Sequence, residues 1–163
     1  MHSHDHCCDH DHCEHKEHHH SHSQHHVEEA LEKLKEAGYK HTNKRQRLVE
    51  ILNDANRYLS AKQVQELIAP EFPQLSYDTI YRNLYTFVQL NILEETEFNG
   101  EKLFRFRCQS HGHHHHFICE KCGSTKEIDM CPMDFFKEQL EGCEIHSHRF
   151  EIFGLCEKCA SKA

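Results

Sequence analysis

The residues best suited to chemistry in this chain are cysteines and histidines near its C-terminal end. Two Cys-x-x-Cys pairs, Cys119 with Cys122 and Cys156 with Cys159, have the spacing of paired zinc knuckles. Four thiolates complete a closed tetrahedral shell, so the pairs predict a structural zinc site without an open position for catalysis. The alternative is two redox-active dithiols.

Four consecutive histidines, His113 to His116, precede the first pair. Because successive side chains of a strand point to opposite faces, His113 and His115 would share one face and His114 and His116 the other. One run can therefore supply two separate metal sites. The alternative is an exposed polar run.

Cys108 lies just before the histidines, near an expected domain junction. A thiolate with two imidazoles and one carboxylate is a tetrahedral set that suits Zn²⁺ better than a harder cation. Cys131 and Cys143 belong to no Cys-x-x-Cys pair, and we expect them to be ordinary thiols.

Composition places these sites in a small intracellular protein. The 163 residues suit one domain or two small ones, and an even count of ten cysteines would indicate disulfides only in a secreted chain. The N-terminus has neither the apolar core of a signal peptide nor a membrane span, so we expect a cytoplasmic protein with metal-binding cysteines and no membrane partner. The net charge of −8 argues weakly against nucleic acid but allows a local basic patch.

Residues 1–26 form a compositionally distinct tail. They hold twelve histidines and three cysteines with almost no apolar residue, and supply half of the net charge. Such a segment cannot bury enough surface to fold alone, so we expect disorder with some metal affinity. An expression tag is the alternative, but the irregular spacing and interspersed Cys and Asp argue against one.

Residues 27–107 have the pattern of a winged helix-turn-helix domain. Helices are predicted from Val27 to Gly38, from Thr42, from Ser60 to the prolines at 70 and 73, and from Ser76 to about Leu90. Strands 92–98 and 102–107 follow, joined by an Asn-Gly turn. An unspecified small helical domain is the alternative.

Residues 108–163 predict a second, smaller unit. Residues 113–119 and 125–130 have the pattern of strands, 132–140 that of a short helix, and 144–155 that of one or two strands. The fold class expected for the whole chain is therefore α+β, with a winged helix-turn-helix followed by a small α/β domain that holds structural zinc.

The fourth helix has the properties of a DNA reader. Ile80, Leu84 and Phe87 share its core face, so Thr79 and Arg82 point away and Tyr81 lies at the margin. Basic residues around Arg45 begin the second helix, where they can contact phosphates. An ordinary solvated face is the alternative.

The chain resembles the ferric uptake regulator family, most closely its zinc uptake regulator branch. The segments that carry the resemblance are Ser76 to Leu84, Gly100 to Cys108, His113 to Cys119, Lys126 to Asp134 and His148 to Gly154. Together they span most of residues 27–160, and the tail lies outside them. The resemblance implies a homodimeric, metal-dependent DNA-binding repressor with a C-terminal dimerisation domain.

The resemblance also implies roles for individual residues. The ligands that it implies for the structural zinc are Cys119, Cys122, Cys156 and Cys159. A sensing zinc would take Glu94, Cys108, His114 and His116. An auxiliary site would take His113, His115, Asp134 and His148, and Glu127 is an alternative ligand. Tyr58 stands where iron and peroxide branches usually supply a histidine, which weakens an iron or peroxide function.

These inferences predict a repressor of zinc uptake genes that binds a palindromic operator as a zinc-loaded homodimer. Each subunit would hold one structural and one or two regulatory Zn²⁺ ions, without a small-molecule substrate. Alternatives in the same family respond to iron, manganese, nickel or peroxide. A zinc buffer or metallochaperone would use the histidines without DNA. A metalloenzyme would need an open coordination position and a general base, and the sequence offers no independent base.

Overall fold

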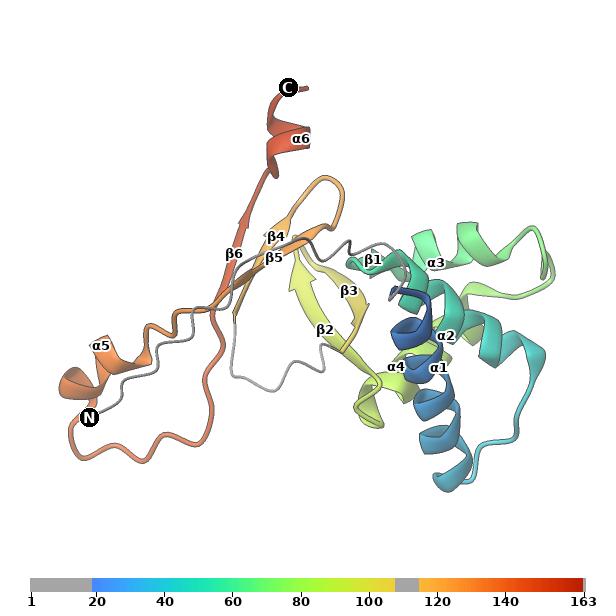
Figure 1. Ribbon diagram of the computed structural model, residues 1–163, viewed down its shortest axis with the longest axis horizontal. Coiled ribbons are helices and arrows are strands. Elements are labelled where there is room, and N and C mark those ends of the chain that lie inside the picture. The colour runs from blue at the N-terminus through green and yellow to red at the C-terminus, as the bar shows by residue number, and fades with distance from the viewer. Residues whose placement is uncertain (1–18, 108–114, 163) are drawn as a thin grey trace, which may run out of the picture.

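The computed structural model describes residues 19–107 and 115–162, and the side chains from residue 24 onward. The helices of the N-terminal half are α1 (His19–Glu36), α2 (Asn43–Ala55), α3 (Ala61–Ile68) and α4 (Tyr77–Gln89). They pack beside a three-stranded antiparallel sheet with the order β1-β3-β2. Its strands are β1 (Leu59–Ser60), β2 (Leu93–Phe98) and β3 (Glu101–Phe106). The predicted winged helix is confirmed, with β2 and β3 as the wing (Figure 1).

Local sequence signals explain where these helices begin. Thr42 accepts a hydrogen bond from Arg45 N at 3.2 Å, and Ser76 caps α4 in the same way through Thr79 N at 3.3 Å. Ser60 forms a full capping box with Gln63 at the start of α3. All three caps lie at the residues predicted from the sequence.

One core holds the helices and the wing together. Leu48, Leu52, Ile80, Leu84 and Phe87 are each at most 1 % exposed, and Phe104 of the wing joins them. The helical face predicted for α4 is therefore its buried face. The core fixes the outer face of α4 because the opposite side of the helix must then meet solvent.

The first helix begins earlier than expected. The sequence predicts disorder through residue 26, whereas α1 begins at His19. Within the expected tail, the His26 ring stacks on Phe106 of the wing, with centroids 6.3 Å apart and planes 17° apart. Residues 1–18 lie outside the described residues, so the rest of the predicted tail stays a prediction.

The C-terminal half forms a second three-stranded sheet with the order β5-β4-β6. Strand β4 (His115–Cys119) pairs antiparallel with β5 (Thr125–Ile128) and parallel with β6 (Glu151–Gly154). Helices α5 (Met133–Lys137), η1 (Glu138–Leu140) and α6 (Glu157–Ala160) complete it. The expected strand over 144–155 is shorter than predicted, since only residues 151–154 pair with β4.

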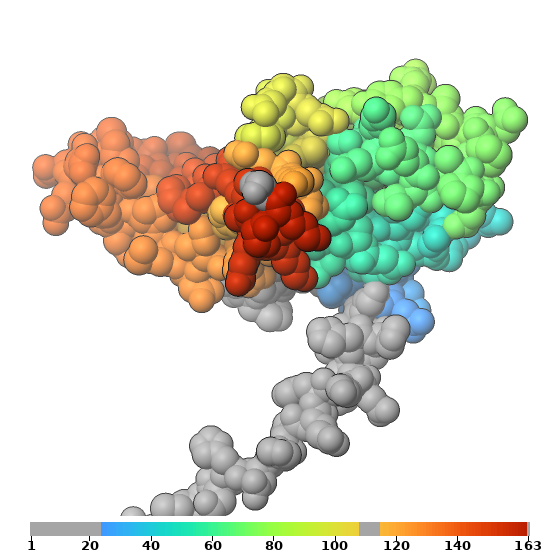
Figure 2. All heavy atoms as spheres, turned by 90° about the horizontal axis from the view of Figure 1, so that it is seen from above, coloured from blue at the N-terminus to red at the C-terminus, as the bar shows by residue number. Residues whose placement is uncertain are grey.

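The two halves lie side by side, with the helical domain on one side and the α5 region on the other (Figure 2). The C-terminal half exposes many large apolar side chains, among them Phe135 at 72 % and Met130 at 76 %. A small domain cannot leave so much apolar surface in water without cost. No helix among the described residues is long and apolar enough to cross a membrane.

Candidate metal centres and nucleic-acid interface

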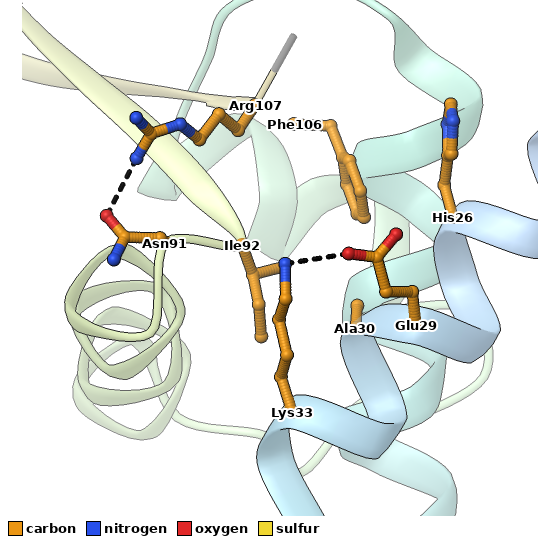
Figure 3. A pocket seen from close by; sticks show the side chains of 8 residues that line it. All are labelled: His26, Glu29, Ala30, Lys33, Asn91, Ile92, Phe106 and Arg107. Atoms are coloured by element: carbon orange, nitrogen blue, oxygen red, sulfur yellow. Dashed lines mark hydrogen bonds and ion pairs between the residues drawn. The ribbon is translucent and has the colours of Figure 1, made fainter. Parts of the chain in front are cut away.

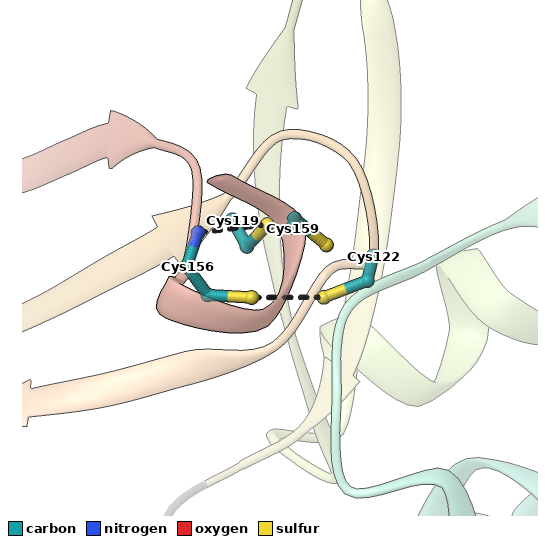
Figure 4. Close-up of side chains that lie close together, drawn as sticks. All are labelled: Cys119, Cys122, Cys156 and Cys159. Atoms are coloured by element: carbon teal, nitrogen blue, oxygen red, sulfur yellow. Dashed lines mark hydrogen bonds between the residues drawn. The ribbon is translucent and has the colours of Figure 1, made fainter. Parts of the chain in front are cut away.

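The four paired cysteines meet at one point. Cys119 and Cys122 lie at the turn that joins β4 to β5, and Cys156 and Cys159 lie at α6, so two segments far apart in the sequence converge (Figure 4). Their sulfur atoms all lie within 4.8 Å of one another. The Sγ atoms of Cys122 and Cys156 are 3.8 Å apart.

This spacing fits a zinc ion. Four sulfurs about 2.3 Å from one tetrahedral zinc lie about 3.8 Å from each other. Backbone amides favour the thiolate of Cys119: burial raises its pKa, but N–H groups of Cys156, Cys122 and Lys121 outweigh burial and lower that pKa to about 6. The neighbouring Cys156 sulfur raises the pKa of Cys159, as expected for thiols packed closely together. The donor set and its spacing therefore suit a closed, structural zinc site.

The zinc knuckle is attached directly to the DNA-binding half. Tyr58 N donates to Gly123 O at 2.9 Å, and Arg57 Nη1 donates to Cys122 O at 3.0 Å. Gly123 has a φ of +71°, and a Cβ there would lie 2.2 Å from the Tyr58 carbonyl oxygen. Only glycine permits both the backbone conformation and this close approach.

The expected sensing site is only partly within the described residues. Cys108 and His114 lie outside them. Glu94 is on β2, where its Oε1 accepts a hydrogen bond from the Tyr58 hydroxyl at 3.3 Å and lies 3.9 Å from Arg105 Nη1. His116 is buried on β4, at 9 % exposure, and its register partner on β6 is Glu151.

Contacts around Glu94 join the wing to the second sheet. The Thr96 hydroxyl donates to Glu151 Oε2 at 2.7 Å, and Arg149 Nη2 donates to the Glu95 carbonyl. Phe98 stacks on Phe153 with centroids 5.1 Å apart. Glu94 therefore lies on the strand through which the two domains contact each other. Sequence reasoning missed Thr96, which contacts the second sheet, and Arg105, which lies beside Glu94 within the wing, because neither residue type signals a place in such a site.

The expected auxiliary site is also partly brought together. His115 and His148 are close, with ring centroids 5.2 Å apart, and Cys131 joins them. Asp134 is on the surface, where its side chain is 84 % exposed and paired with Lys137. Lys137 lowers the pKa of the Asp134 carboxyl. His113 lies outside the described residues, and Glu127 is exposed and pairs in register with His116.

The face of α4 predicted to read DNA is open. Arg82 is exposed and forms an ion pair with Asp78, whose Oδ2 is 2.9 Å from Arg82 Nη2. Thr79 is exposed, and Tyr81 packs edge-on against Phe104 of the wing. Arg45 Nε donates to Asn83 of α4 at 3.1 Å, so the start of α2 and α4 present their polar groups together.

A polar groove separates α1 from the end of the wing (Figure 3). Lys33 pairs with Glu29 at 2.9 Å, and Arg107 Nη1 donates to Asn91 Oδ1 at 2.7 Å. The charges that line the groove are thus already paired with neighbours. The groove lies between the α1 residues from His26 to Lys33 and the end of the wing at Phe106 and Arg107.

Together these features define a two-domain protein with a winged helix, an exposed recognition-type helix and metal-ligand clusters in its second domain. The profile of the ferric uptake regulator family matches residues 36–153. The chain belongs to this family, and it is a metal-responsive transcriptional regulator. The matched residues include α2 to α4, the wing, the histidine run and the first cysteine pair.

Relatives and solved structures agree with this assignment. The chain is similar to the ferric uptake regulation protein of Staphylococcus epidermidis, with 46% identity over 83% of this chain and 96% of that protein. The Staphylococcus aureus protein of the same name is 48% identical over 80% and 96%.

The fold resembles that of the Helicobacter pylori ferric uptake regulator, with a TM-score of 0.65 and 20% identity over 85% of this chain and 93% of that one. A zinc uptake regulator solved with zinc and DNA has a TM-score of 0.62 and 20% identity, over 86% and 96%. The expected fold class, a winged helix followed by a dimerisation domain, is confirmed.

Proposed function

We propose that the protein is a zinc-responsive repressor that binds operator DNA as a zinc-loaded homodimer and controls zinc uptake genes. Each subunit would hold one structural zinc at the four paired cysteines. A sensing zinc would bind Glu94, Cys108, His114 and His116. An auxiliary zinc would bind in the second domain, for which the sequence predicts His113, His115, Asp134 and His148.

The observation that carries the proposal is the place of Glu94. It lies on the wing strand whose neighbours Glu95 and Thr96 contact Arg149 and Glu151 of the second domain. A metal that binds Glu94 together with His116 would hold the wing against the second sheet. Metal would favour DNA binding only if it prefers this closed arrangement over an open one, as linkage requires.

The DNA contact is proposed for α4 and the start of α2. Arg82 and Thr79 are exposed on the face of α4 opposite the core, and Arg45 lies beside them through Asn83. A helix capped at its start by Ser76 and exposed along one face suits the major groove, with basic neighbours on phosphates. A zinc uptake regulator of the same fold was solved with DNA, which supports this partner.

The homodimer is proposed from the exposed apolar residues of the second domain. Phe135, Ile145 and Ile152 are 72 %, 43 % and 42 % exposed, although the domain is small. A second copy that covers this surface would remove the cost of exposing it. Two recognition helices related by a twofold axis would then match a palindromic operator.

The choice of zinc over iron depends on ligand chemistry. The curated relatives carry the name ferric uptake regulation protein, which favours iron. Against it, the proposed ligand set includes the thiolate of Cys108, and softer donors favour zinc. Tyr58 supplies a phenol where a nitrogen ligand would serve iron, and that phenol donates to Glu94.

The decisive experiment selects the DNA sequences that the protein binds and measures the metal content of the bound protein. Random-sequence duplexes would be selected with the full chain in zinc and, in parallel, with chelator, Fe²⁺, Mn²⁺ or Ni²⁺. We expect a palindromic sequence enriched with zinc, and tight binding only after the regulatory zinc is bound. Equal affinity with and without zinc, or tighter binding at lower free Fe²⁺, would exclude the zinc repressor.

Two variants separate the sensor from a zinc buffer. Cys108→Ser should abolish zinc-dependent DNA binding but leave a folded dimer. Arg82→Ala should weaken operator binding markedly without changing zinc content, whereas a zinc buffer would select no operator sequence at all. Normal zinc response in Cys108→Ser would remove that thiolate from the sensing set.

A further inference from the structure

One metal-ligand cluster differs from the set that the family resemblance implies. His115 of β4, Cys131 before α5 and His148 before β6 bring their ligand atoms within 4.8 Å of one another. The Sγ atom of Cys131 is 3.2 Å from His148 Nε2. Three segments separated by up to 33 positions in the sequence thus converge on one point.

The cluster is built on a fixed base. His115 is 4 % exposed, and its ring packs edge-on against Phe150 with centroids 5.5 Å apart. Ile118 of the same strand is fully buried, so packing holds β4 in place. His148 and Cys131 are more exposed than His115 and close the outer side of the cluster.

The spacing suits a tetrahedral metal. A zinc ion with a thiolate at about 2.3 Å and an imidazole nitrogen at about 2.0–2.1 Å places these two donors about 3.5 Å apart. The 3.2 Å observed between Cys131 and His148 differs from this by a few tenths of an ångström. A small outward movement of the exposed His148 would seat the ion.

The implied carboxylate, in contrast, is occupied elsewhere. Asp134 Oδ1 lies 2.5 Å from Lys137 Nζ, one turn along α5, and its side chain is 84 % exposed. No group of metal-ligand atoms that includes Asp134 is found among the described residues. Cys131 is three positions earlier and already faces both histidines.

We propose that His115, Cys131 and His148 form a thiolate-containing metal site, in which Cys131 replaces Asp134 as the third protein ligand. The metal binds the Cys131 sulfur as the thiol proton is released to solvent, and two neutral imidazoles complete three of four positions. One further donor takes the fourth. A sulfur donor makes the site selective for zinc and other soft divalent ions over Fe²⁺ and Mn²⁺.

This inference deepens the auxiliary part of the proposed function and is tested without DNA. Full-length protein would be alkylated with iodoacetamide with and without added zinc, and each cysteine would be followed by peptide mass spectrometry. Zinc should slow alkylation of Cys131 by about tenfold or more, because the metal-bound sulfur is a poor nucleophile. Cys143, exposed in the same domain, is the internal control and should not change.

Variants identify the partners. His148→Gln should abolish the protection of Cys131, whereas His146→Gln, two positions away and also exposed, should preserve it. Asp134→Asn should preserve it as well. Equal alkylation of Cys131 with and without zinc, or loss of protection in Asp134→Asn alone, would overturn the proposal.

A second readout does not require an accessible thiol. The parent chain for this test has Cys7, Cys8, Cys13 and Cys108 changed to serine, and its structural site is filled with zinc. Added Co²⁺ should then give a sulfur-to-cobalt charge-transfer absorption. Cys131→Ser should remove this absorption and Cys143→Ser should not. A spectrum without sulfur character in the parent chain would contradict a thiolate ligand. Failure of zinc-dependent DNA binding would leave both readouts unaffected.

Discussion

The Tyr58 hydroxyl donates a hydrogen bond to Glu94 Oε1 at 3.3 Å, and the backbone N–H of the same tyrosine donates to Gly123 in the zinc knuckle. One residue therefore contacts both the proposed sensing carboxylate and the loop of the proposed structural zinc. Its side chain is 2 % exposed, so the position of the phenol is fixed by packing. The two metal centres of the proposed function are thus mechanically connected through Tyr58.

Tyr58→Phe should weaken zinc sensing without unfolding the protein. The phenol orients Glu94, and loss of such an outer-shell hydrogen bond typically lowers metal affinity by about 10- to 100-fold. The zinc concentration for half-maximal operator binding should rise by that order, while the affinity at saturating zinc stays the same. Metal-buffered fluorescence anisotropy measures both. An unchanged zinc midpoint would show that Tyr58 does not position the ligand.

The same tyrosine should determine how the protein responds to alkali. Burial raises the pKa of Tyr58, and the carboxylates of Glu94 and Glu151 raise it further. The unfolded phenol ionises near pH 10, at about the ordinary value. Stabilisation from the protonated phenol is therefore complete below pH about 10 and is lost as pH rises toward the higher folded pKa.

Absorbance at the phenolate band should show this directly. The titration of the wild type should extend to higher pH than that of Tyr58→Phe, and the wild type should lose unfolding free energy faster above pH about 10. Coincident titrations of the two proteins, after correction for one tyrosine, would contradict the buried, carboxylate-flanked phenol.

Thr96→Val should loosen the contact between the domains. Its hydroxyl donates to Glu151 Oε2 at 2.7 Å, and valine preserves the shape but leaves a half-buried carboxylate with one donor fewer. We expect a loss of about 2 kcal/mol in unfolding free energy, the usual range for a hydrogen bond to a charged group. Urea denaturation measures it.

Thr86→Val is the matched control, because the Thr86 hydroxyl donates to Arg82 O within its own helix. It should cost less than Thr96→Val. Equal effects of the two changes would mean that the contact between domains contributes no more than a local helix bond.

Arg82→Ala should weaken operator binding by about 1–3 kcal/mol if the guanidinium contacts a base edge. Arg82 is 78 % exposed and, among the described charged residues, pairs only with Asp78, which is 70 % exposed, so its loss should not affect folding. Lys35→Ala, at the exposed end of α1, removes the same charge away from α4. Gel-shift titration should show a large effect for Arg82 and a small one for Lys35.

Cys156→Ser should release the structural zinc and destabilise the second domain. Its sulfur is 3.8 Å from Cys122 Sγ, and three thiolates bind zinc less tightly than four. Zinc content should fall by one ion per subunit, and thermal unfolding should begin at lower temperature. Cys143→Ser, with an exposed thiol outside the cluster, should change neither. Full zinc content in Cys156→Ser would remove this residue from the ligand set.

Much of the fold is determined by local sequence. The caps at Thr42, Ser60 and Ser76 lie at the predicted residues because a side-chain oxygen must satisfy the first free N–H groups of each helix. The Asn-Gly turn fixes the wing, since both positions have positive φ in the structure. The cysteine pairs were recognisable because metal-ligand spacing is itself a local pattern.

Tertiary structure decided what local patterns cannot encode. His26, the last residue of the expected tail, stacks on Phe106, and only the folded wing brings that ring into reach. Cys131 had no partner in the sequence, yet β4 and the chain before β6 place His115 and His148 beside it. The histidine run predicted ligands on two faces, because strand alternation is local. Which third ligand each face meets depends on contacts between distant segments, and these exist only once the second sheet has formed.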